Sequence, residues 1–143
     1  MLSGSLAIVA AALFTGAALY INVAEHPARM TLGDASSLAQ WQSSYSRGFA
    51  MQASLALASA LLGLLTYWQT DVIGWFVGSC LIFANWPYTL ILILPVNKRL
   101  QAVEQPGTES SRLLETWARL HAVRTVLGVL AIAAYLLPLS LGS

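Results

Sequence analysis

The sequence predicts an all-α membrane protein, a four-transmembrane-helix bundle, and three observations support that prediction. Hydrophobic residues make up 57% of the 143 residues and charged residues only 9%, whereas about 25% of a soluble domain is charged. The mean hydropathy is +0.68. Four segments with almost no charge are each long enough for a helix of about 20 residues, the length that crosses a bilayer. We expect residues 1–143 to form a single transmembrane domain.

The four predicted spans can be located from the positions of the charged residues. They cover about residues 4–24, 49–68, 72–96 and 120–141, and Arg124 is the only clear charge inside them. Backbone amides in lipid have to be satisfied within the segment, and no two-residue alternation indicates a barrel, so all four spans are predicted to be helices. The first is expected to be retained rather than cleaved as a signal peptide, because no Lys or Arg precedes its long apolar run.

The connections between the spans differ in length. Gln69–Asp71 only closes a helical hairpin, whereas Ser36–Tyr45, inside the first long loop, has the composition of a short interfacial helix. In the second long loop, Gln105-Pro106-Gly107 indicates a turn. The following Thr108–Glu115 predicts a capped cytoplasmic extension of the last helix.

The distribution of Lys and Arg predicts the orientation in the membrane. The loops at residues 25–48 and 97–119, with the start of the last span, contain all seven basic residues: Arg29, Arg47, Lys98, Arg99, Arg112, Arg119 and Arg124. Both loops are therefore expected to be cytoplasmic and both termini to lie on the non-cytoplasmic side, and we expect a bacterial inner membrane. Arg29, Arg47 and Arg119 also admit a simpler interpretation, as anchors of helix ends against lipid headgroups.

The composition excludes several classes of protein. A net charge of +1 without a basic cluster predicts no nucleic-acid partner, because nothing would neutralise phosphates. Disordered chains are polar and poor in aromatic residues, unlike this one. A disulfide scaffold is excluded because Cys80 is the single cysteine. We interpret Cys80 as structural and Gly74-x-x-x-Gly78 as a site of close helix packing. The expected partners are the lipid bilayer and a hydrophobic small molecule, with a homo-oligomer left open.

Polar residues are costly inside a membrane and usually mark function, and here they gather toward the predicted cytoplasmic face. Their spacings of three and four place them on single faces of three helices. These stripes are Asn22, His26 and Arg29 in the first helix, Trp41, Tyr45, Gly48 and Gln52 in the second, and Trp117, His121 and Arg124 in the fourth. The first stripe requires the helix to continue past Pro27, which a proline permits only with a kink or an end.

The third span contributes Asn85-Trp86-Pro87-Tyr88-Thr89 and ends near Asn97. A helix rises about 1.5 Å per residue, so Asn85 lies roughly 18 Å from Asn97, near the middle of the bilayer. The four helices therefore predict a cleft with Asn85 and Trp86 at its floor and His26 and His121 near its cytoplasmic mouth. These are the only two histidines in the chain, and their matched depth beside arginines favours a shared functional site.

Five short motifs occur in order along the chain: Glu25-His26-Pro27-Ala28-Arg29, Gln40-Trp41 with Tyr45 and Arg47-Gly48, Asn85-Trp86-Pro87-Tyr88-Thr89, Pro95-x-Asn97, and Trp117-x-x-x-His121-x-x-Arg124-Thr125. Together they resemble the anthrone oxygenase-like (DUF1772) family of integral membrane proteins. The resemblance implies four membrane helices. It also implies an oxygenase-like activity, because fungal polyketide members are linked to the oxidation of an anthrone to an anthraquinone without an evident cofactor.

That chemistry can be written with residues of the cleft. The expected catalytic residues are His26 or His121, as the general base that removes an acidic methylene proton, and Arg124 with Tyr88 or Asn22, which would stabilise the enolate-like anion. Dioxygen would then add to the carbanion with no cofactor. The expected substrate-binding residues, which would surround a flat aromatic molecule, are Asn22, Trp41, Tyr45, Gln52, Asn85, Trp86 and Trp117.

Two alternatives remain from the sequence. A metal-dependent oxidase would bind Fe or Cu through His26, His121 and Glu25. Against it, Glu25 and His26 are adjacent and point about 100° apart on a helix, and Arg29 and Arg124 would repel a cation. A non-enzymatic small-molecule-binding or scaffold protein fits the same helices. A proton-coupled exporter is disfavoured, because no span has an acidic residue at mid-membrane.

Overall fold

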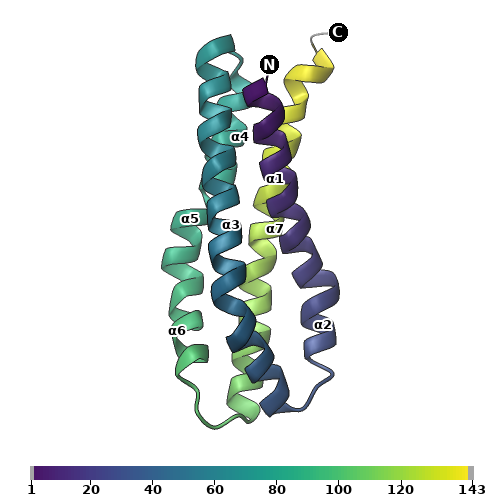
Figure 1. The fold of residues 1–143 in the computed structure, drawn as a ribbon, viewed down its shortest axis with the longest axis vertical. Coiled ribbons are helices and arrows are strands. Elements are labelled where there is room, and N and C mark those ends of the chain that lie inside the picture. Colours follow the sequence, from purple (N-terminus) through teal and green to yellow (C-terminus); the bar gives the residue numbers. More distant parts are fainter. Residues whose placement is uncertain (1, 142–143) are drawn as a thin grey trace.

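The computed structural model describes residues 2–141 and consists of four long helical rods (Figure 1). In chain order the elements are α1 (Leu2–Tyr20), η1 (Ile21–Glu25), α2 (His26–Arg29), α3 (Asp34–Thr70), α4 (Ile73–Phe83), α5 (Asn85–Tyr88), η2 (Thr89–Ile93), α6 (Leu94–Ala102) and α7 (Thr108–Leu141). The first rod joins α1, η1 and α2, and the third joins α4, α5, η2 and α6. All four rods are long and apolar enough to cross a membrane, which confirms the predicted all-α membrane bundle.

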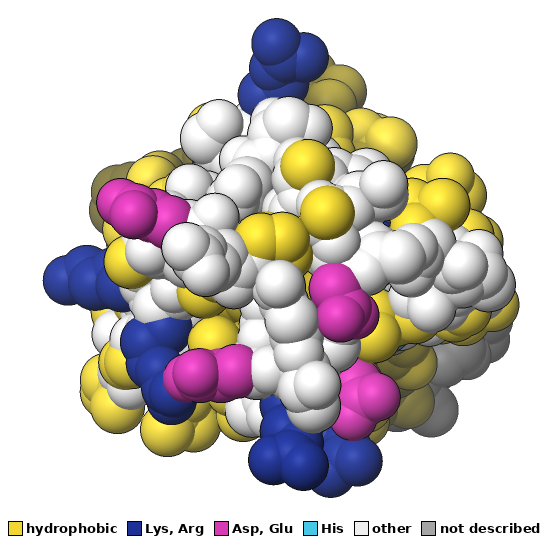
Figure 2. All heavy atoms as spheres, turned by 90° about the horizontal axis from the view of Figure 1, so that it is seen from below, with side chains coloured by type: hydrophobic (Ala, Val, Ile, Leu, Met, Phe, Trp, Pro, Cys, Tyr) yellow, Lys and Arg dark blue, Asp and Glu magenta, His cyan; other side chains and the backbone are white. Residues whose placement is uncertain are grey.

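The two ends of the bundle differ. The start of α1, the end of α7 and the turn between α3 and α4 lie at one end, called the terminal end below (Figure 1). The connections at residues 30–33 and 103–107 lie at the opposite end, called the loop end. Seen from the loop end, basic and acidic side chains surround the bundle (Figure 2). The side of the membrane that each end faces stays a prediction.

The helix boundaries confirm two local predictions and change a third. α7 begins at Thr108, so the predicted extension of the last helix is present. Asp71 closes the α3–α4 hairpin in a left-handed conformation, with φ of 57°. Ser36–Tyr45 is not a separate interfacial helix but the first part of α3, which runs unbroken from Asp34 to Thr70. No proline interrupts that stretch, so nothing in the backbone separates the two parts.

Two wide π-helical turns each precede a proline. η1 ends two residues before Pro27, and η2 ends two residues before Pro95. A proline has no N–H to donate, and its ring clashes with the carbonyl four residues earlier, so an ordinary α-helical turn cannot pass through it unchanged. A π turn is one way for a helix to absorb such a disruption, and such turns are frequent at functional sites. The first rod therefore continues past Pro27 to Arg29, as the predicted polar stripe requires.

At the terminal end, small residues let α3, α4 and α7 approach closely. Tyr135 of α7 is fully buried, and its hydroxyl donates to the Ser59 carbonyl oxygen at 3.1 Å. Its ring lies against Gly78, where a methyl group would come within 2.4 Å of Tyr135 Cδ1. A methyl group on Gly74 would likewise lie 2.8 Å from the Ala134 carbonyl oxygen. The Gly74-x-x-x-Gly78 pattern thus packs against α7, as its spacing predicted.

This contact predicts that Gly78→Ala destabilises the bundle. The added methyl group would overlap a buried ring that has no room to move, and such overpacking typically costs about 1–3 kcal/mol. Thermal or denaturant unfolding of the purified protein in detergent measures the change. Gly16→Ala in α1 is the matched control, because a methyl group there meets no atom within 4 Å. Equal stability of the two variants would contradict the packing described.

Candidate active site

A cavity of about 300 Å³ lies between the rods in the loop-end half of the bundle. This volume is at the lower end of the range found for small-molecule sites. The cavity is lined by Ala17, Tyr20, Ile21, Glu25, Arg29, Trp41, Ser44, Tyr45, Gly48, Phe49, Met51, Gln52, Ile93, Asn97, Trp117, His121 and Arg124. All four rods contribute, so the cavity exists only in the assembled bundle.

Aromatic rings form a large part of the cavity wall. Trp41 and Tyr45 stack with ring centroids 4.9 Å apart and an angle of 14° between their planes. Trp117 meets Trp41 edge to face at 5.8 Å, and Phe49 continues the row beyond Tyr45 at 5.9 Å. Residues 41, 45 and 49 follow one another at helical intervals of four on α3. The wall therefore suits a flat, apolar molecule.

The cavity also reaches the outer surface of the bundle. Tyr20 of α1 and Met51 of α3 belong to its wall and are 60% and 51% exposed. Both residues lie within the predicted spans at residues 4–24 and 49–68, where the surroundings would be lipid and not water. A hydrophobic molecule dissolved in the membrane would meet this opening directly.

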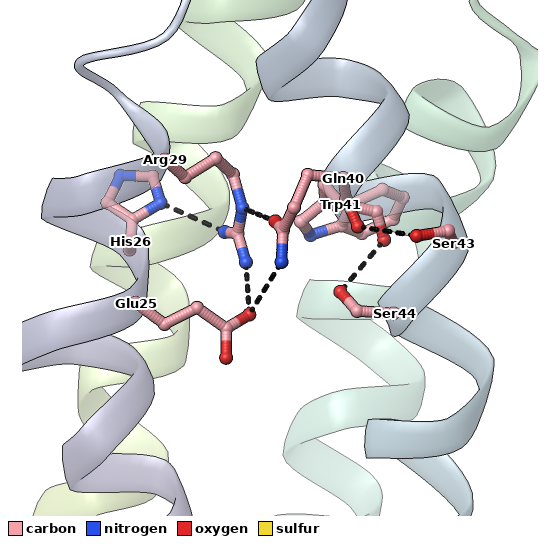
Figure 3. Close-up of polar contacts among 7 residues, drawn as sticks. All are labelled: Glu25, His26, Arg29, Gln40, Trp41, Ser43 and Ser44. Carbon is pink, nitrogen blue, oxygen red and sulfur yellow. Dashed lines mark hydrogen bonds and ion pairs between the residues drawn. The ribbon is translucent and has the colours of Figure 1, made fainter.

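A polar cluster joins Glu25, Arg29 and Gln40 (Figure 3), and Glu25 and Arg29 also line the cavity. The Arg29 guanidinium is ion-paired to Glu25 and donates through Nε to Gln40 Oε1, and Gln40 Nε2 donates to Glu25 Oε1 at 3.4 Å. Arg29 is 3% exposed and also lies over the Trp117 ring, 5.6 Å from its centroid. Arg29 is therefore a buried, neutralised charge that joins α2 to α3, and not a headgroup anchor.

Arg124, in contrast, has no counter-ion among residues 2–141. It is 7% exposed, lines the cavity, and forms no ion pair or hydrogen bond in the described part of the chain. Its guanidinium carbon lies 5.3 Å from the centre of the Phe14 ring. An unpaired buried charge is costly, so a negatively charged partner next to Arg124 would be favoured.

Three further residues of the wall have polar atoms without a partner among the described residues. Both side-chain polar atoms of Gln52 are buried and unpaired, as are Nε1 of Trp41 and Oδ1 of Asn97. Asn97 Nδ2, by comparison, donates to the Tyr45 hydroxyl at 3.1 Å. Buried polar groups normally find a partner in the protein, in ordered water or in a ligand. These atoms therefore add hydrogen-bonding positions around the same space.

His121 lines the cavity and has one of its two ring nitrogens engaged. It is 1% exposed, and its ring packs on Trp117 with centroids 4.8 Å apart. Nδ1 lies 3.2 Å from Asn22 Oδ1. Nε2 makes no hydrogen bond in the described part of the chain. His121 and Arg124 thus come together on one wall, as their spacing on the predicted stripe suggested.

The remaining predicted residues lie beside the cavity and do not line it. His26 packs on Trp117 at 6.2 Å, and its Nδ1 lies 3.3 Å from Arg29 Nη1. The Tyr88 hydroxyl donates to the Leu120 carbonyl oxygen at 2.9 Å. Asn85 and Trp86 line a much smaller neighbouring pocket, of about 10 Å³, whose wall also includes Arg124. The floor of the predicted cleft is thus a separate space that adjoins the cavity at Arg124.

Sequence reasoning missed Gln40 as a partner of Arg29 and Phe49 as part of the wall. Phe49 continues the spacing of Trp41 and Tyr45, so the stripe itself contained that signal. The role of Gln40 depends on how α2 approaches α3 across the connection at residues 30–33, which no spacing rule describes.

The proposed metal ligands do not converge in this structure. Among residues 2–141, no group of three or more His, Cys, Asp or Glu side chains lies close enough to hold a metal ion. The Glu25 carboxylate is ion-paired with Arg29. His121 faces the cavity, while His26 lies outside its lining. The donor set suggested by the sequence therefore does not fit a three-ligand metal site.

Comparison with known families gives one match. The model of the family described as anthrone oxygenase matches residues 41–134, which is more than half of the chain. The matched segment includes Trp41, Tyr45, His121 and Arg124, while Asn22 and His26 precede it. No curated protein and no solved structure is significantly similar to the chain.

The polar cluster predicts that Glu25→Ala destabilises the bundle by about 2 kcal/mol, because it removes charged hydrogen bonds from a buried guanidinium. Glu109→Ala is the control, since Glu109 pairs with Arg99 at 3.4 Å between largely exposed side chains and such pairs contribute at most about 1 kcal/mol. Unfolding in detergent compares the two variants. An effect of Glu25→Ala no larger than that of the control would show that Arg29 does not depend on its carboxylate.

Proposed function

The chain belongs to the anthrone oxygenase family, and from this premise we propose that it is a membrane-embedded oxygenase that acts on a small, flat aromatic ketone with an acidic methylene group. The observation that carries the proposal is that His121 and Arg124 line one aromatic-walled cavity. A base and a fixed positive charge on one wall are what removal of a proton next to a conjugated carbonyl requires.

Proton removal is assigned to His121 and not to His26. A general base has to reach the proton that it removes, directly or through one water, and His121 lines the cavity whereas His26 does not. The unengaged Nε2 is the atom that accepts the proton. Loss of that proton moves negative charge onto the carbonyl oxygen of the substrate, which gives an enolate-like anion.

Arg124 stabilises that anion. The guanidinium has no carboxylate to neutralise it among the described residues, so its full charge is available to an oxygen that becomes negative during the reaction. A charge fixed in place before the reaction costs no reorganisation and acts strongly where water is excluded. Arg29 is unsuited to this role, because Glu25 already neutralises it.

The carbanion then adds to dioxygen to form a peroxide at the methylene carbon. Protonation of the peroxide and loss of water leave a carbonyl group, so that one dioxygen and the methylene yield a ketone and one water. The electrons come from the substrate carbon, and we propose that no metal or organic cofactor takes part. Substrate and dioxygen both dissolve in the bilayer and would enter past Tyr20 and Met51, which are exposed at the rim.

The orientation of the site follows from the charge distribution. We place the loop end in the cytoplasm and the protein in a bacterial inner membrane, because residues 25–48 and 97–119, which include the helix ends there, contain six of the seven Lys and Arg residues. In this orientation the Glu25–Arg29–Gln40 cluster lies toward the cytoplasmic end of the cavity, while the rim at Tyr20 and Met51 faces lipid.

The base assignment is tested with His121→Ala and His26→Ala, measured with an anthrone in detergent or nanodiscs under air. We expect His121→Ala to lower kcat by about 10²–10⁴-fold, the usual contribution of a general base, and His26→Ala to change it much less. Anthraquinone formation and oxygen consumption are followed together. If both variants keep full activity, histidine is not the base. If the wild type binds anthrones without oxidising them, the protein is a binding protein and not an oxygenase.

The role of Arg124 is tested with Arg124→Gln, which keeps a polar side chain of similar length. Loss of a preorganised group that stabilises an oxyanion typically costs about 10²–10³ in kcat, and we expect a drop of that order. Arg119→Gln is the matched control, because Arg119 lies on the same helix but is exposed. A larger effect at Arg119 than at Arg124 would contradict the assignment.

A further inference from the structure

Asn22 does not line the cavity, although it lies beside His121 and connects α7 to the first rod. Its amide has three partners, all on α7. Nδ2 donates to the Ala118 carbonyl oxygen at 3.2 Å, and Oδ1 accepts from the Thr125 hydroxyl at 2.8 Å. The same Oδ1 lies 3.2 Å from His121 Nδ1. Both acceptor positions of Oδ1 and one of the two N–H donors of Nδ2 are therefore used within the protein.

We propose that Asn22 and Thr125 are positioning residues that hold His121 in the tautomer with hydrogen on Nδ1, so that Nε2 faces the cavity as an acceptor. The catalytic relevance of this inference rests on the proposed function, since the tautomer determines whether His121 can act as a base. It also replaces the substrate-binding role that the sequence suggested for Asn22.

The three contacts leave one consistent arrangement of hydrogens. The Ala118 carbonyl can only accept, so the atom of Asn22 that faces it has to be the NH2 group. The reversed amide would place two oxygens against each other and give up this bond. With the amide fixed in this way, Oδ1 faces both Thr125 and His121, and an amide oxygen can only accept. His121 Nδ1 therefore carries the hydrogen.

This tautomer has a direct chemical consequence. A neutral imidazole has one N–H and one nitrogen with a free lone pair, and the hydrogen bond made by one nitrogen decides the state of the other. With the hydrogen on Nδ1, the lone pair is on Nε2, the nitrogen that makes no hydrogen bond in the described part of the chain. The opposite tautomer would present an N–H to the substrate and could not take its proton.

The wide turn at η1 explains how Asn22 reaches this position. Asn22 is the second residue of η1, and Pro27 follows two residues after the turn ends. A π turn contains an extra residue, so it changes the direction in which the following side chains point. Pro27 has no N–H to donate, and the π turn before it contains Asn22, the hydrogen-bond partner of His121 on α7.

The experiment reads the tautomer directly by two-bond ¹H–¹⁵N NMR of labelled protein in detergent micelles, with no substrate. The parent is His26→Gln without a histidine tag, because His121 is then the only imidazole in the chain. In this parent at a pH where His121 is neutral, we expect a protonated Nδ1 and an unprotonated Nε2. An Nε2–H tautomer in the parent would overturn the inference, even if every further variant failed to fold.

Asn22→Leu in the same parent removes the acceptor, and we expect a mixture of the two tautomers or a majority of Nε2–H. Asn85→Leu is the matched control, because Asn85 is a buried asparagine whose Nδ2 donates only to Ile82; the tautomer there should not change. An unchanged tautomer in Asn22→Leu would also overturn the inference.

Kinetics separates this inference from the proposed function. With an anthrone, Asn22→Leu should lower kcat by at least about tenfold with a smaller change in KM, since the wrong tautomer leaves the substrate bound but without a base. If the tautomer changes as expected while the wild type oxidises no anthrone, the positioning of His121 stands and the proposed reaction fails. If the wild type is active and kcat of Asn22→Leu is unchanged, positioning by Asn22 is irrelevant to the reaction.

Discussion

A bilayer offers polar groups no water, so each buried charge or amide has to be matched by another part of the chain or by a ligand. This requirement organises the loop-end half of the bundle. Glu25 and Gln40 match Arg29, and Asn22 matches one edge of His121. Arg124 has no such match in the described part of the chain. The unmatched charge therefore sets Arg124 apart from the polar groups that hold the helices together, and the proposed ligand site rests on this difference.

In the terminal-end half, buried polar groups are matched within closely packed helices that leave no comparable cavity among the described residues. Small residues at Gly63, Gly74 and Gly78 leave no space at the contacts between α3, α4 and α7, and the few hydroxyl groups bond to one another or to carbonyls. Close packing at one end fixes the directions in which the rods continue toward the other. In the loop-end half, the bulky side chains of Trp41 and Trp117 lie between the rods where the terminal-end half has glycines. The rods enclose the cavity there.

Much of this arrangement follows from composition and spacing. The absence of charge over four long stretches predicts the rods, and intervals of three and four predict that Trp41, Tyr45 and Gln52 share one face of α3 and His121 and Arg124 one face of α7; all five line the same cavity. A helix repeats its faces regularly, so these residues can be placed before any tertiary contact is known. The continuous α3 was not predicted, because the polar composition of Ser36–Tyr45 suits an interfacial helix as well as an extension of a membrane helix.

The two histidines show where such reasoning stops. In the sequence they look alike, since each lies close to an arginine at the same predicted depth. In the structure His26 follows the wide turn at η1 and meets Arg29, whereas His121 lies on the regular helix α7 and faces the cavity. Helical spacing assumes a uniform turn, and a π turn changes the direction of every side chain after it. The residues beyond a π turn therefore have to be placed by structure, while those on the uninterrupted α3 and α7 can be placed by counting.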